Sequence, residues 1–436
     1  MFGVVVNVTF RVSPNIPVAF WRVQRNLNWQ NVDVRNEIYD MMRWWLDMGV
    51  DGFRMDAIVL LAKRELEDVE NPVDIKYLGN NPGIHDYLQE MYNLVLKHYS
   101  VFTVGEIPFI TAEEGILYVG EDRNELNTLF HFQVCDMMET MDLIQYKSIQ
   151  AEWYYVMWGK GWNSQFLNNH DHTRQVTRFG NDSEYRIQSA KLLATMLHTL
   201  PGMPYIYQGE EIGMTGVDYD SIDDYDDIMM RNKYFECLRI NPDDDKDDLL
   251  RQLKLLSRDN SRSPMQWHNR DSNAGFTKEG SKPWIQINPN YKDINVESSI
   301  KDRNSVFWYY RRLISLRKRH PVMVYGDYHD YDRKHPNIYI YRRSLIDEFW
   351  LIVLNHCDDS LEYPIPKELS QRTREILLAN YDDADKDNIS LTMRLRPHEA
   401  RIYIIMSDKS KILTAEEKQK TDEAELEEND PMILPM

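Results

Sequence analysis

Three acidic side chains follow three separate apolar stretches of the chain and have the types that acid and base chemistry needs. Asp56, Glu106 and Asp171 come after the stretches 50–55, 100–104 and 164–168. Cleavage of a glycosidic bond requires one carboxyl group that stays protonated and a second one that stays ionised. The three acids are therefore candidates for this chemistry, provided that the fold brings them to one end of a sheet.

The neighbours of two of these acids predict different proton affinities. Arg54 and Asp56 alternate along an expected strand, so they project to one face, and a guanidinium group favours a charged carboxylate. Glu106 is followed by the apolar residues 107–109 and has no basic neighbour in the sequence, and apolar surroundings raise a carboxyl pKa. Asp56 therefore suits a nucleophile and Glu106 an acid/base. Asp171, beside His170, suits a third role of holding sugar hydroxyls.

Each of these patterns also has a plain structural interpretation. An Arg-x-Asp pair is more often a salt bridge, a glutamate after glycine is usually a turn or surface charge, and Asn-His-Asp is a common loop composition. Glu210 and Glu211 in Gln-Gly-Glu-Glu could merely cap a helix. Tryptophans 162, 267 and 284 could stack on sugar rings, yet most tryptophans are core residues. No single pattern decides the function.

The elements that must position the acids are strands that alternate with amphipathic helices. Strands are expected at 50–55, 100–104, 126–134, 164–168 and 204–208, and helices at 36–48, 84–98 and 184–199, with Asp33 or Asn36 capping the first helix. This alternation predicts an α/β fold with parallel βα units. A TIM barrel collects its active site at the carboxyl ends of such strands. No glycine-rich loop follows any of these strands, which disfavours a nucleotide-binding fold.

The second half of the chain has a different pattern. Residues 215–300 show no clear periodicity and are expected to form a long irregular, functional loop. After a helix at 302–319, short strands at 338–341, 349–354, 375–379 and 401–406 predict a small β-sandwich. The expected domains are an atypical segment 1–26, a partial catalytic barrel 27–325, a β domain 326–406 and a disordered tail 407–436.

Composition excludes several functional classes. With 70 acidic and 51 basic residues among 436, the formal charge is −19, which argues against a nucleic-acid partner because such binding needs Lys and Arg. The three cysteines lie far apart and form no metal-binding or redox spacing. We expect no metal, no cofactor, no signal peptide and no membrane segment, and a cytoplasmic location. The sequence does not indicate the oligomeric state.

Taken together, the motifs resemble those of the α-amylase superfamily, glycoside hydrolase family thirteen, in its oligo-α-glucosidase branch of maltases and oligo-1,6-glucosidases. The similarity extends from about residue 27 to at least residue 326. The motifs that carry it are residues 51–56, 103–106, 169–171 with Arg174, 204–214, 262–267, 273–276 and 288–291.

This resemblance implies a function and a fold. Asp56 would be the nucleophile, Glu106 the acid/base and Asp171 the transition-state stabiliser, while Arg54, His170 and Arg262 would contact the sugar in the first subsite. The implied reaction is retaining hydrolysis of terminal α-glucosidic bonds in a disaccharide or small oligosaccharide. The implied fold is a TIM barrel of which strands four to eight are evident, followed by a C-terminal β domain.

Substrate choice within the branch stays open. In relatives a valine after the nucleophile goes with α-1,6 bonds, and this chain has Ala57, which favours α-1,4 bonds. Maltose, isomaltose and short oligosaccharides are the leading substrates. Sucrose and trehalose phosphate are alternatives.

Some features depart from the family pattern. Barrel strands one to three of the family have no counterpart in this sequence, so we expect a chain that is truncated at its N-terminus. Residues 1–20 are then expected to come from outside the ancestral coding sequence, and strand 50–55 is expected to have an open edge. Asp226 stands where the branch commonly has arginine. An inactive fragment and a non-catalytic relative of α-glucosidases are therefore the alternative functions.

Overall fold

A computed structural model describes residues 5–8, 27–63, 79–137, 140–366, 374–384 and 392–405. The chain divides into two compact units. Unit 1 comprises residues 1–136 and 149–164, and unit 2 comprises residues 137–148 and 165–436. The predicted tail 407–436 and most of the predicted segment 1–26 lie outside the described residues.

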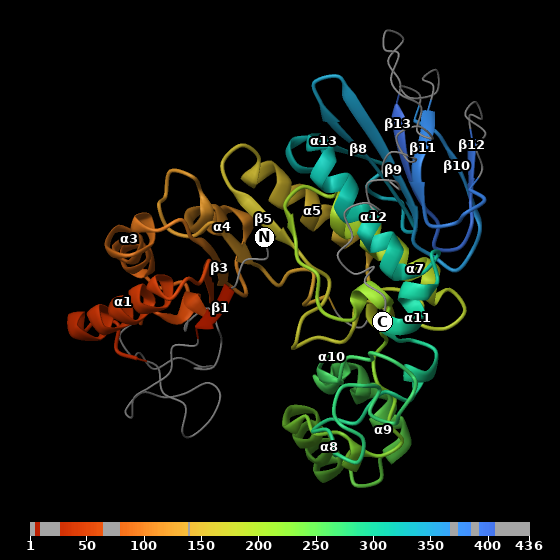
Figure 1. Ribbon diagram of the computed structural model, residues 1–436, viewed down its shortest axis with the longest axis horizontal. Coiled ribbons are helices and arrows are strands. Elements are labelled where there is room, and N and C mark those ends of the chain that lie inside the picture. The colour runs from red at the N-terminus through yellow and green to blue at the C-terminus, as the bar shows by residue number, and fades with distance from the viewer. Residues whose placement is uncertain are drawn as a thin grey trace. The chain divides into compact units, whose positions relative to one another are not determined.

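Unit 1 is built on a parallel sheet whose strands are neighbours in the order β1-β2-β3-β4-β5. Strands β1, β3 and β5 are labelled in Figure 1. The bounds are β1 Val5–Val8, β2 Gly52–Met55, β3 Phe102–Glu106, β4 Thr128–Phe130 and β5 Trp162–Gln165. Because a parallel pair needs a crossover connection, helices separate β2 to β5 along the chain. The predicted parallel βα pattern is confirmed.

The expected open edge on β2 is wrong. β1 pairs with β2 in parallel, from Val5 opposite Gly52 to Val8 opposite Met55. Strand pairing needs only an extended backbone, and the valine-rich sequence of β1 has high β-propensity although it carries no family motif. On the other edge of β2, a Cβ atom at Gly52 would lie 1.8 Å from the carbonyl oxygen of Phe102, so only glycine allows the close approach of β3.

Helices follow the strands of unit 1, with bounds that differ from those predicted. They are α1 Val32–Asp47, α3 Ile84–Leu94, α4 Ala112–Val119 and α5 Leu143–Met157, which runs on from unit 2, with short 3-10 turns at Ile58–Leu60 and Leu96–His98. The N-cap of α1 is Asn31, whose side chain accepts a hydrogen bond from the Asp33 backbone, so the predicted caps were wrong. Helices α4 and α5 were not predicted.

In unit 2, two helices pack on each other. Helix α7 (Arg186–Thr199) and helix α12 (Val306–Arg319) are linked by the hydroxyls of Thr195 and Tyr309, 2.8 Å apart. The remaining elements before the C-terminal strands include α6 Gln175–Phe179, β6 Met203–Pro204, a 3-10 turn at Glu210–Ile212 and α13 Pro321–Tyr325. The predicted helices 184–199 and 302–319 are confirmed, whereas the strand predicted at 204–208 is a two-residue element.

Residues 215–300 contain several short helices, which the expected irregular loop did not include, while residues 263–288 are irregular as predicted. The helices include α8 Ile228–Ile240, α9 Lys246–Leu253, α10 Asp259–Arg262 and α11 Val296–Lys301, and α8, α9 and α10 lie together in Figure 1. A separate apolar cluster supports them, formed by Val217, Tyr219, Tyr225, Met230, Tyr234, Leu249, Leu250 and Leu253. These helices are short and are flanked by acidic residues, so the hydrophobic periodicity of the sequence did not reveal their apolar faces.

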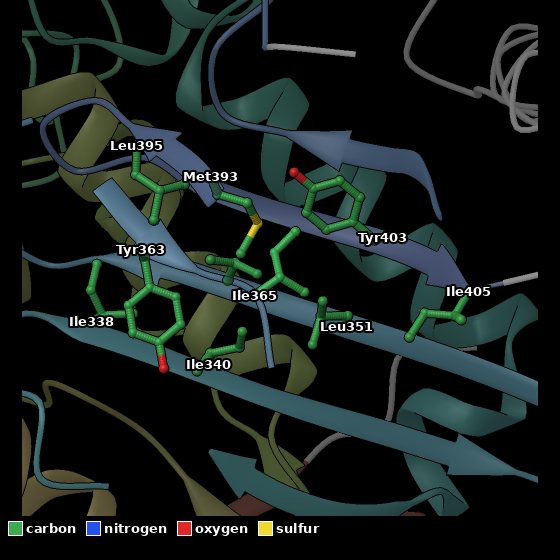
Figure 2. Packing of buried hydrophobic residues seen from close by; sticks show 10 residues of the cluster. Ile338, Ile340, Leu351, Tyr363, Ile365, Met393, Leu395, Tyr403 and Ile405 are labelled. Atoms are coloured by element: carbon green, nitrogen blue, oxygen red, sulfur yellow. The ribbon is translucent and has the colours of Figure 1, made fainter. Parts of the chain in front are cut away.

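The C-terminal part of unit 2 consists of two antiparallel sheets. One has the order β11-β13-β9-β8-β7 and the other pairs β10 with β12. The bounds are β7 Asp327–Tyr331, β8 Ile338–Leu345, β9 Glu348–Asn355, β10 Leu361–Pro364, β11 Arg374–Ala379, β12 Thr392–Leu395 and β13 Ala400–Ile405. Side chains from both sheets meet in one apolar core (Figure 2). The predicted β-sandwich is therefore present, although β7, β10 and β12 were missed.

Buried basic side chains satisfy backbone carbonyls in this unit. The Lys147 ammonium group, on α5, donates to the carbonyl oxygens of His335 and Ile338 at 2.6 and 3.0 Å. The three cysteines, all of which lie in the described part of the chain, form no disulfide bond. Within the described ranges, no helix has the length and apolar character needed to cross a membrane.

The sandwich core predicts a stability contrast within the same sheet. Leu351 is fully buried in β9, whereas Ile346, in the turn between β8 and β9, is 87% exposed. Truncating Leu351 to alanine should lower the free energy of unfolding by about 2–5 kcal/mol through lost transfer energy and a cavity. Ile346→Ala should change it by less than about 0.5 kcal/mol. Urea unfolding followed by tryptophan fluorescence measures both, and equal effects would contradict the proposed core.

Candidate active site

The Arg54 cluster, formed by Arg54, Asp56, Ala57 and Glu106, lies at the carboxyl ends of β2 and β3 in unit 1. The guanidinium of Arg54 forms an ion pair with Asp56 and a second one, of 2.8 Å, with Oε2 of Glu106. The same Oε2 accepts a hydrogen bond of 2.9 Å from the backbone N–H of Ala57. One cation thus holds two carboxylates that follow neighbouring parallel strands.

The expectation that no cation lies near Glu106 is wrong, because Arg54 binds it. In register, Arg54 lies opposite Val104, two residues before Glu106, and its long side chain reaches along the sheet edge. Burial nevertheless raises the pKa of Glu106, and the nearby Asp56 raises it further, while Arg54 and the Ala57 N–H act in the opposite direction. The net shift of the Glu106 pKa is upward, in the direction that the apolar neighbours in the sequence predicted.

Ala57 has an unusual backbone conformation. Its φ and ψ angles of 44° and 39° lie in the left-handed region, which costs a non-glycine residue roughly 1 kcal/mol or more. In this conformation the Ala57 N–H reaches Glu106. Strain of this kind persists where surrounding contacts impose it, and it concentrates at functional sites.

The Asp171 cluster, formed by His170, Asp171, Arg258 and Arg262, lies in unit 2. Arg262 Nη2 and Arg258 Nε contact Oδ1 of Asp171 at 2.8 and 3.2 Å, and His170 Nε2 lies 3.3 Å from Oδ2. Arg262 Nε also donates to the backbone carbonyl of His170 at 2.8 Å. Asp171 therefore lies among two guanidinium groups and an imidazole.

The loop before Asp171 is fixed by its own side chains. Oδ1 of Asn169 accepts hydrogen bonds from the Asp171 backbone and the His172 ring, both at 2.8 Å. Burial lowers the pKa of His172 to about 4, so that ring is neutral at pH 7. The turn thus presents Asp171 and His170 from one rigid segment.

Each site residue that was predicted from the sequence contacts at least one other predicted site residue of the same unit. Arg54, Asp56 and Glu106 contact one another in unit 1, and His170, Asp171 and Arg262 do so in unit 2. Sequence reasoning missed Arg258, because the basic residues of segment 257–262 give no signal of which one faces an acid. Within the described residues, no group of His, Cys, Asp and Glu is arranged to hold a metal ion.

The three tryptophans singled out from the sequence have different environments. Trp162 lies in β5 and is half-buried, while Trp267 and Trp284 are 48% and 73% exposed. The indole N–H of Trp284 donates to the carboxylate of Asp226, the residue that replaces the arginine of the branch.

Glu210 is a fully buried acid in unit 2. Its Oε1 accepts a hydrogen bond of 3.2 Å from the hydroxyl of Tyr310, which in turn accepts one of 3.0 Å from Gln175. Glu210 is 1% exposed, and burial raises its pKa well above the ordinary value. The raised pKa favours the uncharged form of this side chain, so Glu210 is a buried core residue and more than a simple helix cap.

Comparisons of the sequence and of the structure with known proteins point to one protein family. A sequence model described as Alpha amylase, catalytic domain, matches residues 18–326. The oligo-1,6-glucosidase of Parageobacillus thermoglucosidasius is 44% identical over 402 residues, which cover 88% of this chain and 71% of that protein.

Two solved structures extend the similarity to three dimensions. The trehalose-6-phosphate hydrolase of Bacillus licheniformis matches with a TM-score of 0.82 and 34% identity, covering 88% of this chain and 70% of its own. An inactive MutB double mutant in complex with isomaltulose matches with a TM-score of 0.81 and 33% identity, covering 88% and 71%. The predicted α-amylase-type barrel followed by a C-terminal β domain is confirmed.

The buried Glu210 predicts a pH-dependent stability difference. Because the folded-state pKa lies above the unfolded value near 4.5, its contribution is fully present below pH 4.5 and is lost as pH rises towards the folded-state pKa. Glu210→Gln stays neutral, so its free energy of unfolding relative to the wild type should increase with pH, by up to about 1.4 kcal/mol per pH unit. Urea unfolding between pH 5 and 8 measures this difference.

The matched control is Glu279→Gln at an exposed glutamate. Its difference from the wild type should stay constant over the same pH range. A constant difference for Glu210→Gln as well would show that this carboxyl titrates normally in the folded protein.

Proposed function

Because the chain belongs to the α-amylase family of glycoside hydrolases, in its α-glucosidase and oligo-1,6-glucosidase-like branch, we propose that it hydrolyses terminal α-glucosidic bonds with retention. The substrates are maltose, isomaltose or short oligosaccharides. The observation that carries this proposal is the Arg54 cluster, where one guanidinium holds two carboxyl groups and one of these has a raised pKa. Retaining glycosidases use two carboxyl groups only about 5 Å apart.

In the first step, Glu106 donates its proton to the glycosidic oxygen while the Asp56 carboxylate attacks the anomeric carbon. The bond to the leaving sugar breaks, and glucose becomes covalently bound to Asp56. The raised pKa of Glu106 supports this assignment, since a general acid must carry its proton near the working pH. Arg54, which contacts both carboxyl groups, keeps Asp56 oriented for attack.

In the second step, the Glu106 carboxylate removes a proton from water, and the oxygen of that water attacks the anomeric carbon. Asp56 leaves, and the second inversion restores the original configuration. We assign Asp171 the role of stabilising the positively charged, distorted sugar in both transition states. His170 and Arg262 are proposed sugar-binding residues, because both contact Asp171 and are partly exposed.

Removing the nucleophile and the acid/base should have different consequences. Asp56→Asn should abolish glucose release from every substrate. Glu106→Gln should remove most activity on maltose but spare the first step with p-nitrophenyl α-glucoside, whose leaving group needs no acid. Azide, which needs no base, should then restore turnover and give the α-glucosyl azide.

Equal loss by Glu106→Gln on both substrates, without azide rescue, would refute the acid/base assignment. The pH profile adds a second check. Since Glu106 must be protonated, activity should fall as pH rises through a pKa above the ordinary value of 4.5. No activity in the soluble wild-type chain would favour the inactive or non-catalytic alternatives.

The residue after the nucleophile predicts linkage preference. Ala57 favours α-1,4 bonds by family resemblance, so kcat/KM should be higher for maltose than for isomaltose, and Ala57→Val should shift the ratio towards isomaltose. Valine is poorly suited to the left-handed backbone at this position, so a lower Tm should accompany the change. Sucrose and trehalose 6-phosphate complete the substrate panel, and faster cleavage of either would reassign the substrate.

A further inference from the structure

Arg174 is a buried cation whose hydrogen bonds go to backbone carbonyls and one hydroxyl. It is 1% exposed. Its Nε donates to the carbonyl of Asn260 at 3.1 Å, and its Nη1 donates to that of Gln208 at 2.8 Å. Its Nη2 lies within 3.4 Å of the carbonyl oxygens of Ser261 and Ser263 and of the Ser263 hydroxyl.

Apart from the Gln208 carbonyl, these acceptors belong to helix α10, a single turn from Asp259 to Arg262, and to its C-cap Ser263. The last carbonyls of a helix have no partner within it, and a cation at this end satisfies them and opposes the helix dipole. Burial lowers the pKa of Arg174 to about 10, so the side chain is still charged at neutral pH. One planar guanidinium therefore fixes the C-terminal end of α10.

Helix α10 matters because the residues at its two ends bind Asp171. Arg258 is the N-cap of α10 and Arg262 is its last residue, and both contact Oδ1 of Asp171. Arg174 follows Asp171 by three residues, so it ties the loop of the acid to the helix of its partners. We propose that Arg174 is a positioning residue that acts through Arg258 and Arg262 to hold Asp171, and this rests on the proposed function.

The surroundings of Arg174 fit this role. A Cβ atom at Gly209 would lie 2.6 Å from Arg174 Nη1, so glycine at this position leaves space for the guanidinium. The Tyr207 ring lies 5.9 Å from the guanidinium carbon, and its hydroxyl donates to the Ser261 carbonyl at 3.0 Å. Residues 207–209 and α10 therefore converge on one buried charge.

A general role in stability is the competing explanation, and the chain offers a matched control. Arg317 is also buried, its pKa is also lowered to about 10 by burial, and it also donates to backbone carbonyls, including those of His198 and Met323 at 2.9 Å. Its partners do not contact Asp171. Arg174→Lys and Arg317→Lys each keep the charge but lose the planar fork that reaches several carbonyls at once.

The two variants should lose similar stability but differ in catalysis. Arg174→Lys should lower kcat on maltose on the order of 10- to 100-fold with KM within about threefold, because small displacements of catalytic groups mainly affect the transition state. Arg317→Lys should leave kcat within about threefold of the wild type. Equal kcat losses in the two variants would reduce Arg174 to a structural residue.

A double-mutant cycle tests the route through Asp171. In an Asp171→Asn background, Arg174→Lys should change the residual kcat on p-nitrophenyl α-glucoside by less than about threefold, because the group that it positions is already altered. If Arg174→Lys lowered kcat in the Asp171→Asn background by the same factor as in the wild type, the proposal would be overturned. Arg317→Lys should have the same small effect in both backgrounds.

A crystal structure of Arg174→Lys gives a readout that does not depend on activity. The contacts of Arg258 and Arg262 with Asp171 should open beyond 4 Å. If both contacts persist, the positioning proposal fails even when the wild type is active. If they open but the wild type cleaves none of the tested sugars, the proposed function fails and the structural coupling stands.

Discussion

The ion pairs of Arg54 are the constraint on which the candidate site depends. Two carboxyl groups beside each other repel when both are ionised, and burial of Glu106 adds to this cost. A guanidinium between them offsets the repulsion and fixes both orientations through its rigid fork. The parallel register of β2 and β3, with glycine at position 52, brings the three groups to the same sheet edge.

In unit 2, the Asp171 cluster also pairs a carboxylate with guanidinium groups. Here the acid is single and the cations are several, so an ionised carboxylate is compensated from more than one direction. Side chains of Asn169 and Arg174 fix the backbone on either side of the acid. Buried polar groups of this kind require complete hydrogen bonding, and the carbonyls around Arg174 provide it.

Unit 2 combines several small cores. The helices of segment 215–300 pack on their own tyrosine and leucine cluster, and the C-terminal sandwich has another core between its sheets. Lys147 and Arg343 connect elements by donating hydrogen bonds to the backbone carbonyls of Ile338, Thr199 and Met323.

The sequence by itself determined the parallel βα pattern, the C-terminal β domain and the three candidate acids, because hydrophobic periodicity and short motifs are local properties. Tertiary structure decided the rest. The pairing of β1 with β2, the approach of Arg54 to Glu106 and the contact of Arg258 with Asp171 join residues that are 47, 52 and 87 positions apart in the chain. Such contacts depend on strand register and on the path of the backbone, which local patterns do not encode. The helices of segment 215–300 were missed for a related reason, since their packing on one another stabilises them more than their own weak propensity does.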